Sequence, residues 1–419
     1  MKKRLVAFIL FLALVLSMTG ALTACGVASA KSVDMMQGVR AKEVNTEVDM
    51  TGSGAVAVTD FAVRLFRNSM TVGENSLISP ASVLYALAMT ANGARGEARA
   101  QMEEVLGMPV EELNEYLHVW QGWLSRQGDN CKLSLANAIW FKDVESFTVN
   151  EEFLQTNADY YGAAIYKAPF DKGTCADINN WVSKNTDKMI DGIIDEIPDD
   201  AVMYLVNALA FDAEWKNIYN ERQVREGTFT TEKGDEQQAE FMYGSLYEYL
   251  EDDLAAGFVK QYAGGRYAFV AMLPNEGVSV SEYVQSLTGE HLQNLLKEPQ
   301  RIEVYTSLPK FQAEFEADLR EVLKTMGMVR PFADGLEGVG KSTEDIYMAI
   351  SRVVHKTFIS VDEKGTKAGA ATAVMMEPTS APPPQEYKEV YLDRPFVYMI
   401  VDNVTNITIF IGTVMDMES

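Results

Sequence analysis

The feature that most constrains this chain is a run of very small side chains near the C-terminus. From Ala368 to Ala373 every residue is Ala, Gly or Thr, so the run has little to bury and no hydrophobic reason of its own to fold. It nevertheless lies between strand-like apolar stretches at 349–361 and 395–401. Long loops held between core strands are more often functional than idle, so we expect the Pro-ended segment 375–384 to be functional.

Because side chains alternate between the two faces of a strand, the same run could join a β-sheet with one face buried. The other face, which carries Lys367 and Glu377, would keep these two charges in solvent. A flexible linker is the alternative, but linkers favour Ser, Gly and polar residues over Ala, Thr and Val. We therefore expect a loop that is able to become a strand. The face suited to burial carries Thr366, Ala368, Ala370, Thr372, Val374 and Met376.

The surroundings of this loop resemble the hinge, reactive-centre loop and C-terminal strands of the serpin family. The matching runs are 362–372, 393–398 and 410–412, and the resemblance extends over about residues 57–415. It implies the serpin fold, with three β-sheets, about eight or nine helices and an exposed reactive-centre loop at about 363–392. Helical patterns followed by many strand patterns, without regular alternation, independently indicate the α+β class.

The resemblance implies a suicide inhibitor of serine proteases rather than an enzyme. The target protease attacks the loop and forms an acyl-enzyme. The freed segment then inserts into the main sheet as a new strand, which traps the protease in a covalent complex. No cofactor and no metal are implied, and we expect a monomer.

The hinge decides whether a serpin inhibits, because non-inhibitory relatives tend to carry charged, bulky or Pro residues there. After Glu363 the hinge residues here are small, and Lys367 faces away from the sheet, so we expect an inhibitor. The alternative is a non-inhibitory serpin that acts as a surface binding protein. The resemblance assigns the hinge to Glu363, Gly365, Thr366, Ala368, Gly369, Ala370, Ala371 and Thr372.

The resemblance also places the reactive bond. Spacing from Glu363 puts it at Thr379-Ser380, with Ser380-Ala381 and Met376-Glu377 as alternatives. Bonds that precede Pro are poor protease substrates, which weighs against other bonds nearby. Thr, Ser or Ala before the cut suits a narrow specificity pocket, and no Lys or Arg lies between residues 374 and 387. We therefore expect elastase-like or subtilisin-like targets rather than trypsin-like ones.

Four polar residues far apart in the chain match a hydrogen-bond cluster that serpins keep beneath the point where the main sheet parts. They are Ser79, Ser82, Asn207 and His355. Such a cluster could hold the sheet closed and still keep its groups paired after a rearrangement, although a lone His in an apolar strand is usually a satisfied core residue. Trp215 matches the family's Trp at the top of the sheet, where insertion begins; a plain core aromatic is the alternative.

Residues 1–24 predict an export signal. A basic start precedes an apolar stretch that is short for a membrane span, and Leu22-Thr-Ala-Cys25 resembles a bacterial lipobox, in which the Cys is lipidated. An ordinary secretory signal cut elsewhere is the alternative. We expect an extracellular protein held at the bacterial cell surface by a lipid on Cys25, its only membrane contact. A tether at 25–54 would then precede a serpin domain at 55–419.

The charge balance bears on the partners. The formal net charge is -24, and loss of residues 1–24 removes three basic residues and no acidic one, which leaves -27. Such a surface repels nucleic acid and is not expected to bind heparin. The target protease and any other partner should therefore be neutral or basic.

Other functional patterns are weak. The segment 335–342 matches the phosphate-binding pattern G-x-x-x-x-G-K-S, but that chemistry needs a buried strand before it and a helix after it, and neither is expected here. The three His are far apart, and no G-x-S-x-G or H-E-x-x-H motif marks a catalytic site. Cys131 and Cys175 fit no metal site, and the sequence leaves open whether they pair.

Overall fold

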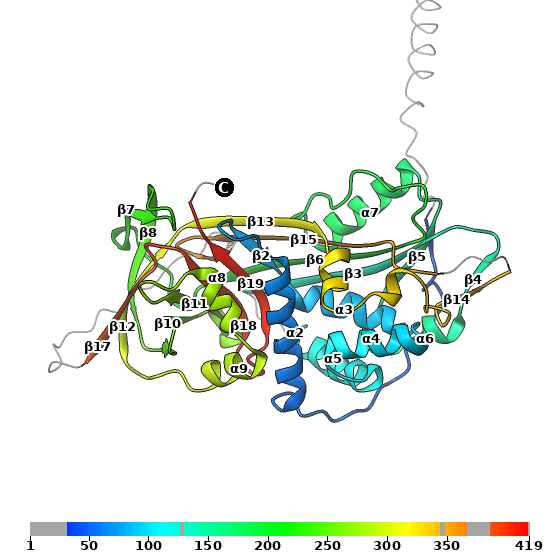
Figure 1. Cartoon of the computed structure of the whole chain (residues 1–419), viewed down its shortest axis with the longest axis horizontal. Helices are drawn as coiled ribbons and strands as arrows, with labels where there is room; N and C mark the ends of the chain where they lie inside the picture. The colour runs from blue at the N-terminus through cyan, green and yellow to red at the C-terminus, as the bar shows by residue number, and fades with distance from the viewer. Residues whose placement is uncertain (1–31, 126–129, 344–347, 367–385, 418–419) are drawn as a thin grey trace, which may run out of the picture.

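The structure is a computed structural model that describes residues 32–125, 130–343, 348–366 and 386–417. Over these residues it combines nine α-helices with three large β-sheets and a two-stranded ribbon (Figure 1). The expected α+β class and the expected number of helices are confirmed. The ribbon, β4 (Phe147–Val149) with β14 (Gly340–Ser342), adds a small fourth sheet to the three that were predicted.

The main sheet has seven strands and runs along the long axis of the molecule (Figure 1). β6 is buried over nearly its whole length, as expected for a strand that is covered on both faces. In spatial order the strands are β1 (Val33–Asp34), β5 (Ala164–Ala168), β3 (Cys131–Lys142), β6 (Met203–Glu214), β16 (Gly365–Thr366), β15 (Arg352–Val361) and β13 (Phe311–Asp318).

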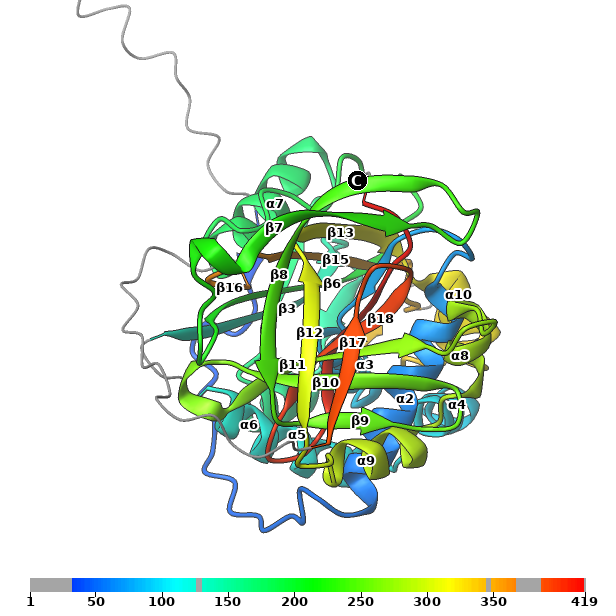
Figure 2. The same cartoon turned by 90° about the vertical axis from the view of Figure 1, so that its left-hand side faces the viewer.

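Two further sheets lie at one end of the main sheet, where Figure 2 shows the four-stranded sheet in front of the six-stranded one. The six-stranded sheet consists of β2 (Ser76–Ile78), β19 (Thr408–Val414), β18 (Phe396–Asp402), β11 (Tyr267–Pro274), β10 (Ala255–Gln261) and β9 (Tyr249–Glu251). The four-stranded sheet consists of β17 (Tyr387–Tyr391), β12 (Glu303–Pro309), β8 (Glu236–Leu246) and β7 (Val224–Thr230).

Helices cover both faces of the main sheet, with α7 on one side and α3, α4 and α5 on the other (Figure 1). α3 follows a Ser79 cap and begins with Pro80, and all of its residues are buried, so it lies in the centre of the molecule. The helices are α2 (Ser53–Ser69), α3 (Pro80–Ala91), α4 (Gly96–Leu106), α5 (Val110–Leu124), α6 (Glu151–Tyr161), α7 (Lys172–Asn185), α8 (Val280–Ser286), α9 (Gly289–Lys297) and α10 (Arg320–Thr325).

The described part of the expected tether is not a free tether. Val33 pairs with Lys167 at the edge of the main sheet, and the Met35 amide donates to the Ile165 carbonyl over 2.8 Å. Met50 is buried, and α2 begins at Ser53. The prediction of a tether was wrong for residues 32–52. Their composition is mixed and polar, but the segment also contains a few apolar side chains that pack against the hydrophobic core.

The expected end of the loop at residue 392 is also wrong. β17 starts at Tyr387 and pairs in parallel with β12, so the loop ends no later than Glu386. The polar and aromatic residues of β17 resemble a loop in sequence, but Val390 alternates inward and is buried.

Cys131 in β3 and Cys175 in α7 are both buried and free, so these two thiols do not pair with each other. Burial raises the pKa of the Cys131 thiol to about 12, which keeps it in the unreactive thiol form. None of the helices in the described ranges is long and apolar enough to span a membrane.

Candidate functional site

The hinge begins inside the main sheet. β6 and β15 pair directly and in parallel between Tyr204–Ala210 and Arg352–Phe358. Beyond that stretch β16 lies between them and is antiparallel to both strands, with Thr366 opposite Val361 and Ala213. Two residues of the predicted hinge, Gly365 and Thr366, therefore already occupy a slot between β6 and β15.

Packing fixes this start of the hinge. Thr366 is fully buried, and its hydroxyl lies 2.6 Å from the hydroxyl of Tyr262. At Gly365 a Cβ atom would lie 2.0 Å from the Ala213 carbonyl oxygen, so the backbones approach too closely for any side chain. The inward direction of Thr366 agrees with the face that the two-residue period predicts.

The turn before the hinge is bonded to the segment that follows β6. The Trp215 indole NH donates to the Asp362 carbonyl over 2.8 Å, and the Trp215 amide donates to the Lys364 carbonyl over 2.8 Å. The Tyr219 amide donates to the Glu363 carbonyl over 2.9 Å. Trp215, predicted to lie at the top of the sheet, thus contacts the turn 362–364 directly.

Glu363 points out of the sheet toward a lysine. Its carboxylate lies 2.9 Å from the Lys310 ammonium, which also contacts Glu240 at 3.2 Å. The hydrogen bond from Lys310 lowers the pKa of the Glu363 carboxyl, so this ion pair is present at neutral pH. It ties the turn 362–364 to the residue between β12 and β13.

Lower in the same slot, the four polar residues predicted to form a cluster do come together. The Ser79 amide donates to His355 Nε2 over 3.1 Å, and His355 Nδ1 lies 2.5 Å from Asn207 Oδ1. The Ser82 hydroxyl donates to the same Asn207 oxygen over 3.0 Å, and the Asn207 amide donates to the Val354 carbonyl. The cluster therefore joins α3, β6 and β15.

The hydrogen bonds define the protonation of His355. Because Nε2 accepts from an amide, the proton of the neutral ring is on Nδ1, which donates to Asn207. His355 is fully buried, and burial lowers its pKa to about 3. The ring is therefore neutral at physiological pH, and its charging would break the contact with Ser79.

Several predicted site residues fall outside the described ranges: Cys25, Ala368, Gly369, Ala370, Ala371, Thr372, Thr379 and Ser380. The prediction missed Lys310 and Tyr262, which contact Glu363 and Thr366. A weak signal was present for each of them. Lys310 follows a strand in the segment that resembles the family, and Tyr262 precedes the Gly264-Gly265 turn.

The phosphate-binding pattern lacks its required setting. A 3₁₀ turn at Arg330–Phe332 precedes Gly335, and Ser342 ends β14 instead of opening a helix. The structure therefore gives no support to nucleotide binding at 335–342.

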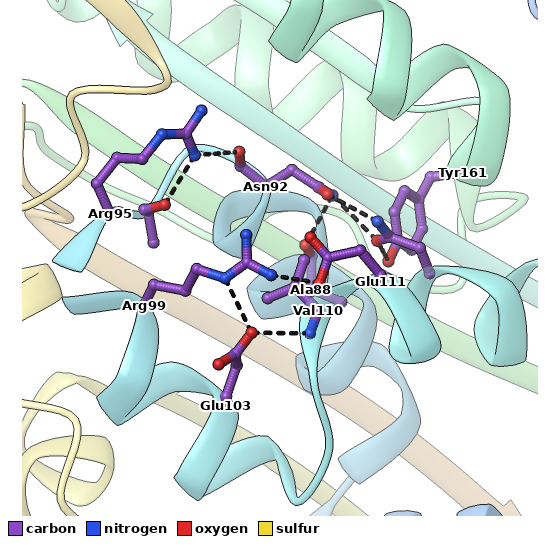
Figure 3. Close-up of polar contacts among 10 residues, drawn as sticks. Ala88, Asn92, Arg95, Arg99, Glu103, Val110, Glu111 and Tyr161 are labelled. Carbon is purple, nitrogen blue, oxygen red and sulfur yellow. Dashed lines mark hydrogen bonds and ion pairs between the residues drawn. The ribbon is translucent and has the colours of Figure 1, made fainter. Parts of the chain in front are cut away.

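A second polar cluster, drawn in Figure 3, lies between α3, α4, α5 and α6. Asn92 and Asn114 exchange two amide hydrogen bonds of 3.1 and 2.8 Å, and the Tyr161 hydroxyl donates to Asn114 over 2.6 Å. Arg99 pairs with Glu103 and Glu111 nearby. These groups satisfy one another across four helices, so we regard the cluster as structural.

The fold and the hinge define a class of protein in which a short strand, β16, enters the main sheet between two strands that pair directly with each other farther along. The family model described as "Serpin (serine protease inhibitor)" matches residues 56–417. The chain belongs to the serpin family.

Individual relatives support this assignment. The crystal structure of a thermophilic serpin, tengpin, in its native state has 45% sequence identity and a TM-score of 0.87, covering 92% of this chain and all of that one. An uncharacterized serpin-like protein of Thermococcus kodakarensis is 29% identical, over 86% of this chain and 85% of its own length. Human neuroserpin is 28% identical, over 87% and 92% of the two chains.

Proposed function

We propose that this protein is an irreversible inhibitor of serine proteases that acts through loop cleavage, acyl-enzyme trapping and strand insertion. The observation that carries the proposal is the position of β16 between β6 and β15. Residues 365–366 already pair with β6 and β15, while farther along the sheet these two strands pair directly with each other, with no strand between them. Insertion of the following residues would extend an existing strand and need not start a new one.

Hydrogen bonding supplies a driving force for this insertion. Before cleavage, the hydrogen bonds between β6 and β15 form one parallel ladder, which we call the seam, and β16 is antiparallel to both strands. Each residue that follows Thr366 into the seam would replace part of one parallel ladder by two antiparallel ladders, which are slightly more stable per residue. The loop connects β16 to β17, and cleavage would separate these two ends, so that the residues after Thr366 are free to follow it into the sheet.

The composition of the loop supports a target with a narrow specificity pocket. We assign the reactive bond to Thr379-Ser380 and the targets to elastase-like or subtilisin-like proteases, since basic residues are absent from 375–386. The leader and Cys25 support export and lipid anchoring at a bacterial cell surface, with the acidic body facing the protease. The protein would act as a monomer without cofactor, metal or nucleic acid.

The test is to incubate the mature protein with pancreatic elastase and with subtilisin, followed by denaturing gels and intact-mass analysis. We expect an SDS-resistant complex and a released C-terminal fragment that begins at Ser380. Trypsin should give little complex. Complex with trypsin but with neither of the other proteases would contradict the assignment of the target class.

Thr366 supplies a matched pair of variants. In Thr366→Arg a charged side chain replaces the hydroxyl that meets Tyr262 in the buried slot, so insertion should fail and the protein should be cleaved without trapping the protease. Thr366→Ser keeps the hydroxyl and should trap the protease like the wild type. If cleavage of the wild type gives no complex with any protease and no rise in melting temperature, the inhibitory function is refuted and a non-inhibitory binding protein is favoured.

A further inference from the structure

Lys260 is a buried lysine beside the insertion site. It lies on β10, only 3% of its surface is exposed, and its ammonium nitrogen donates to the Asn217 carbonyl over 3.0 Å. The same nitrogen lies 4.0 Å from the ring centroid of Tyr219 and 5.0 Å from that of Trp215. Within the described ranges no carboxylate forms an ion pair with it, so its contacts are one carbonyl and two aromatic faces.

The residues that Lys260 contacts are those that hold the turn before the hinge. Trp215 and Tyr219 bond the backbone of 362–364, and we call residues 215–219 the clamp segment. Next to Lys260, the Gln261 carbonyl accepts from the Lys216 amide over 2.9 Å. The clamp segment is therefore held between β10 on one side and the turn on the other.

We propose that Lys260 is a positioning residue for loop insertion, which holds the clamp segment so that the hinge stays aligned with the slot between β6 and β15. This inference rests on the proposed function. Insertion of the cleaved loop competes with hydrolysis of the acyl-enzyme. A hinge that is already in register should insert faster, so that less acyl-enzyme is hydrolysed before the protease is trapped. A looser clamp segment would let more inhibitor be cleaved without trapping a protease.

A lysine suits this place because its amine can donate to Asn217 while its stem fills an apolar gap. An apolar side chain of similar length would fill the gap but would leave the Asn217 carbonyl without this donor. Charged, the amine would also be attracted to the faces of Trp215 and Tyr219. The contact is thus specific to an amine and is more than a matter of volume.

Burial lowers the pKa of Lys260 to about 7, so the closed clamp segment favours the neutral amine. A neutral amine still donates to the Asn217 carbonyl.

The test compares the wild type with Lys260→Met, which fills the space without a donor. Its matched control is Lys324→Met, since Lys324 also lies near an aromatic ring, that of Phe332, but on α10. Hydrogen exchange of segments 213–219 and 361–366, corrected for the intrinsic rate, reports opening in the unreacted protein. We expect about fivefold more opening in Lys260→Met at pH 8 and no change in Lys324→Met.

Protease reactions then connect the contact to insertion. With elastase, Lys260→Met should acylate at the wild-type rate but give several times more cleaved inhibitor per trapped protease. Unchanged exchange in Lys260→Met, or an unchanged ratio of cleaved to trapped inhibitor, would overturn the inference. If Lys260→Met does not fold, Lys260→Leu takes its place, and unchanged exchange in that variant overturns the inference equally.

The two hypotheses fail differently. A wild type that traps no protease and gains no melting temperature on cleavage refutes the proposed function, while its exchange data still decide whether Lys260 holds the clamp segment. Normal trapping with no effect of Lys260→Met refutes only the role of Lys260.

Discussion

The neutral, buried His355 predicts a specific sensitivity to acid. Its pKa is about 3 in the folded protein and would return to about 6.5 in the unfolded chain. The unfolded chain therefore binds more protons between these values, so stability is fully present above pH 6.5 and is lost as the pH falls toward 3. Each pH unit within this window corresponds to about 1.4 kcal/mol.

Between pH 7 and pH 4.5 this single group should remove about 2.5 kcal/mol from the free energy of unfolding, a large share of the stability of an ordinary domain. The structural reason is that charging puts a proton on Nε2, where the Ser79 amide already donates. The loss should first appear at the seam between β6 and β15, because the cluster joins these strands to α3.

The assay is urea unfolding at pH 7 and pH 4.5, followed by tryptophan fluorescence, for the wild type and His355→Gln. Glutamine keeps one donor and one acceptor but does not titrate. When the loss of unfolding free energy between pH 7 and pH 4.5 is compared between the two proteins, the contributions of the shared carboxylates and of the other two His cancel. The wild type should lose about 2.5 kcal/mol more than the variant. Equal losses in both proteins would refute the argument that His355 is held neutral by its cluster.

Further predictions concern the hinge, the N-terminal segment and the thiols. Gly365→Val should displace the hinge, since its Cβ would lie 2.0 Å from the Ala213 carbonyl, and a rise in limited proteolysis of the turn would show this. Deletion of residues 32–50 should lower the melting temperature by several degrees, because it exposes the β5 edge and the contacts of the buried Met50; an unchanged melting temperature would contradict this packing. Cys131 and Cys175 should react with a thiol reagent only after unfolding, and rapid labelling of the native protein would contradict their burial.

The sequence predicts β6 and α3 well because each has a local signal. β6 is a continuous apolar run, and α3 starts at a Ser-Pro cap, so both are visible in composition alone. The resemblance assigned the four residues of the cluster, and the structure adds the directions of their hydrogen bonds and the tautomer of His355.

Features that depend on contacts between distant segments were not predictable. The pairing of Val33 with β5 rests on two residues with no strand pattern around them. The burial of Lys260 contradicts the usual preference of lysine for solvent, and only its position beneath Trp215 explains it. The depth to which the hinge enters the sheet is likewise set by Tyr262 and Ala213, which lie far from Thr366 in sequence.

The position of the last two strands has a consequence for biosynthesis. β18 and β19 are buried along their whole length, and Ile411 of β19 pairs with Ile78 of β2, which the ribosome makes 333 residues earlier. The six-stranded sheet thus lacks its centre until residues 396–414 have been made. Such long-range closure is slow, and it leaves the nascent chain unable to complete its core. A chain that must cross a membrane unfolded would benefit from this delay, since its folding cannot finish before these two strands have been made.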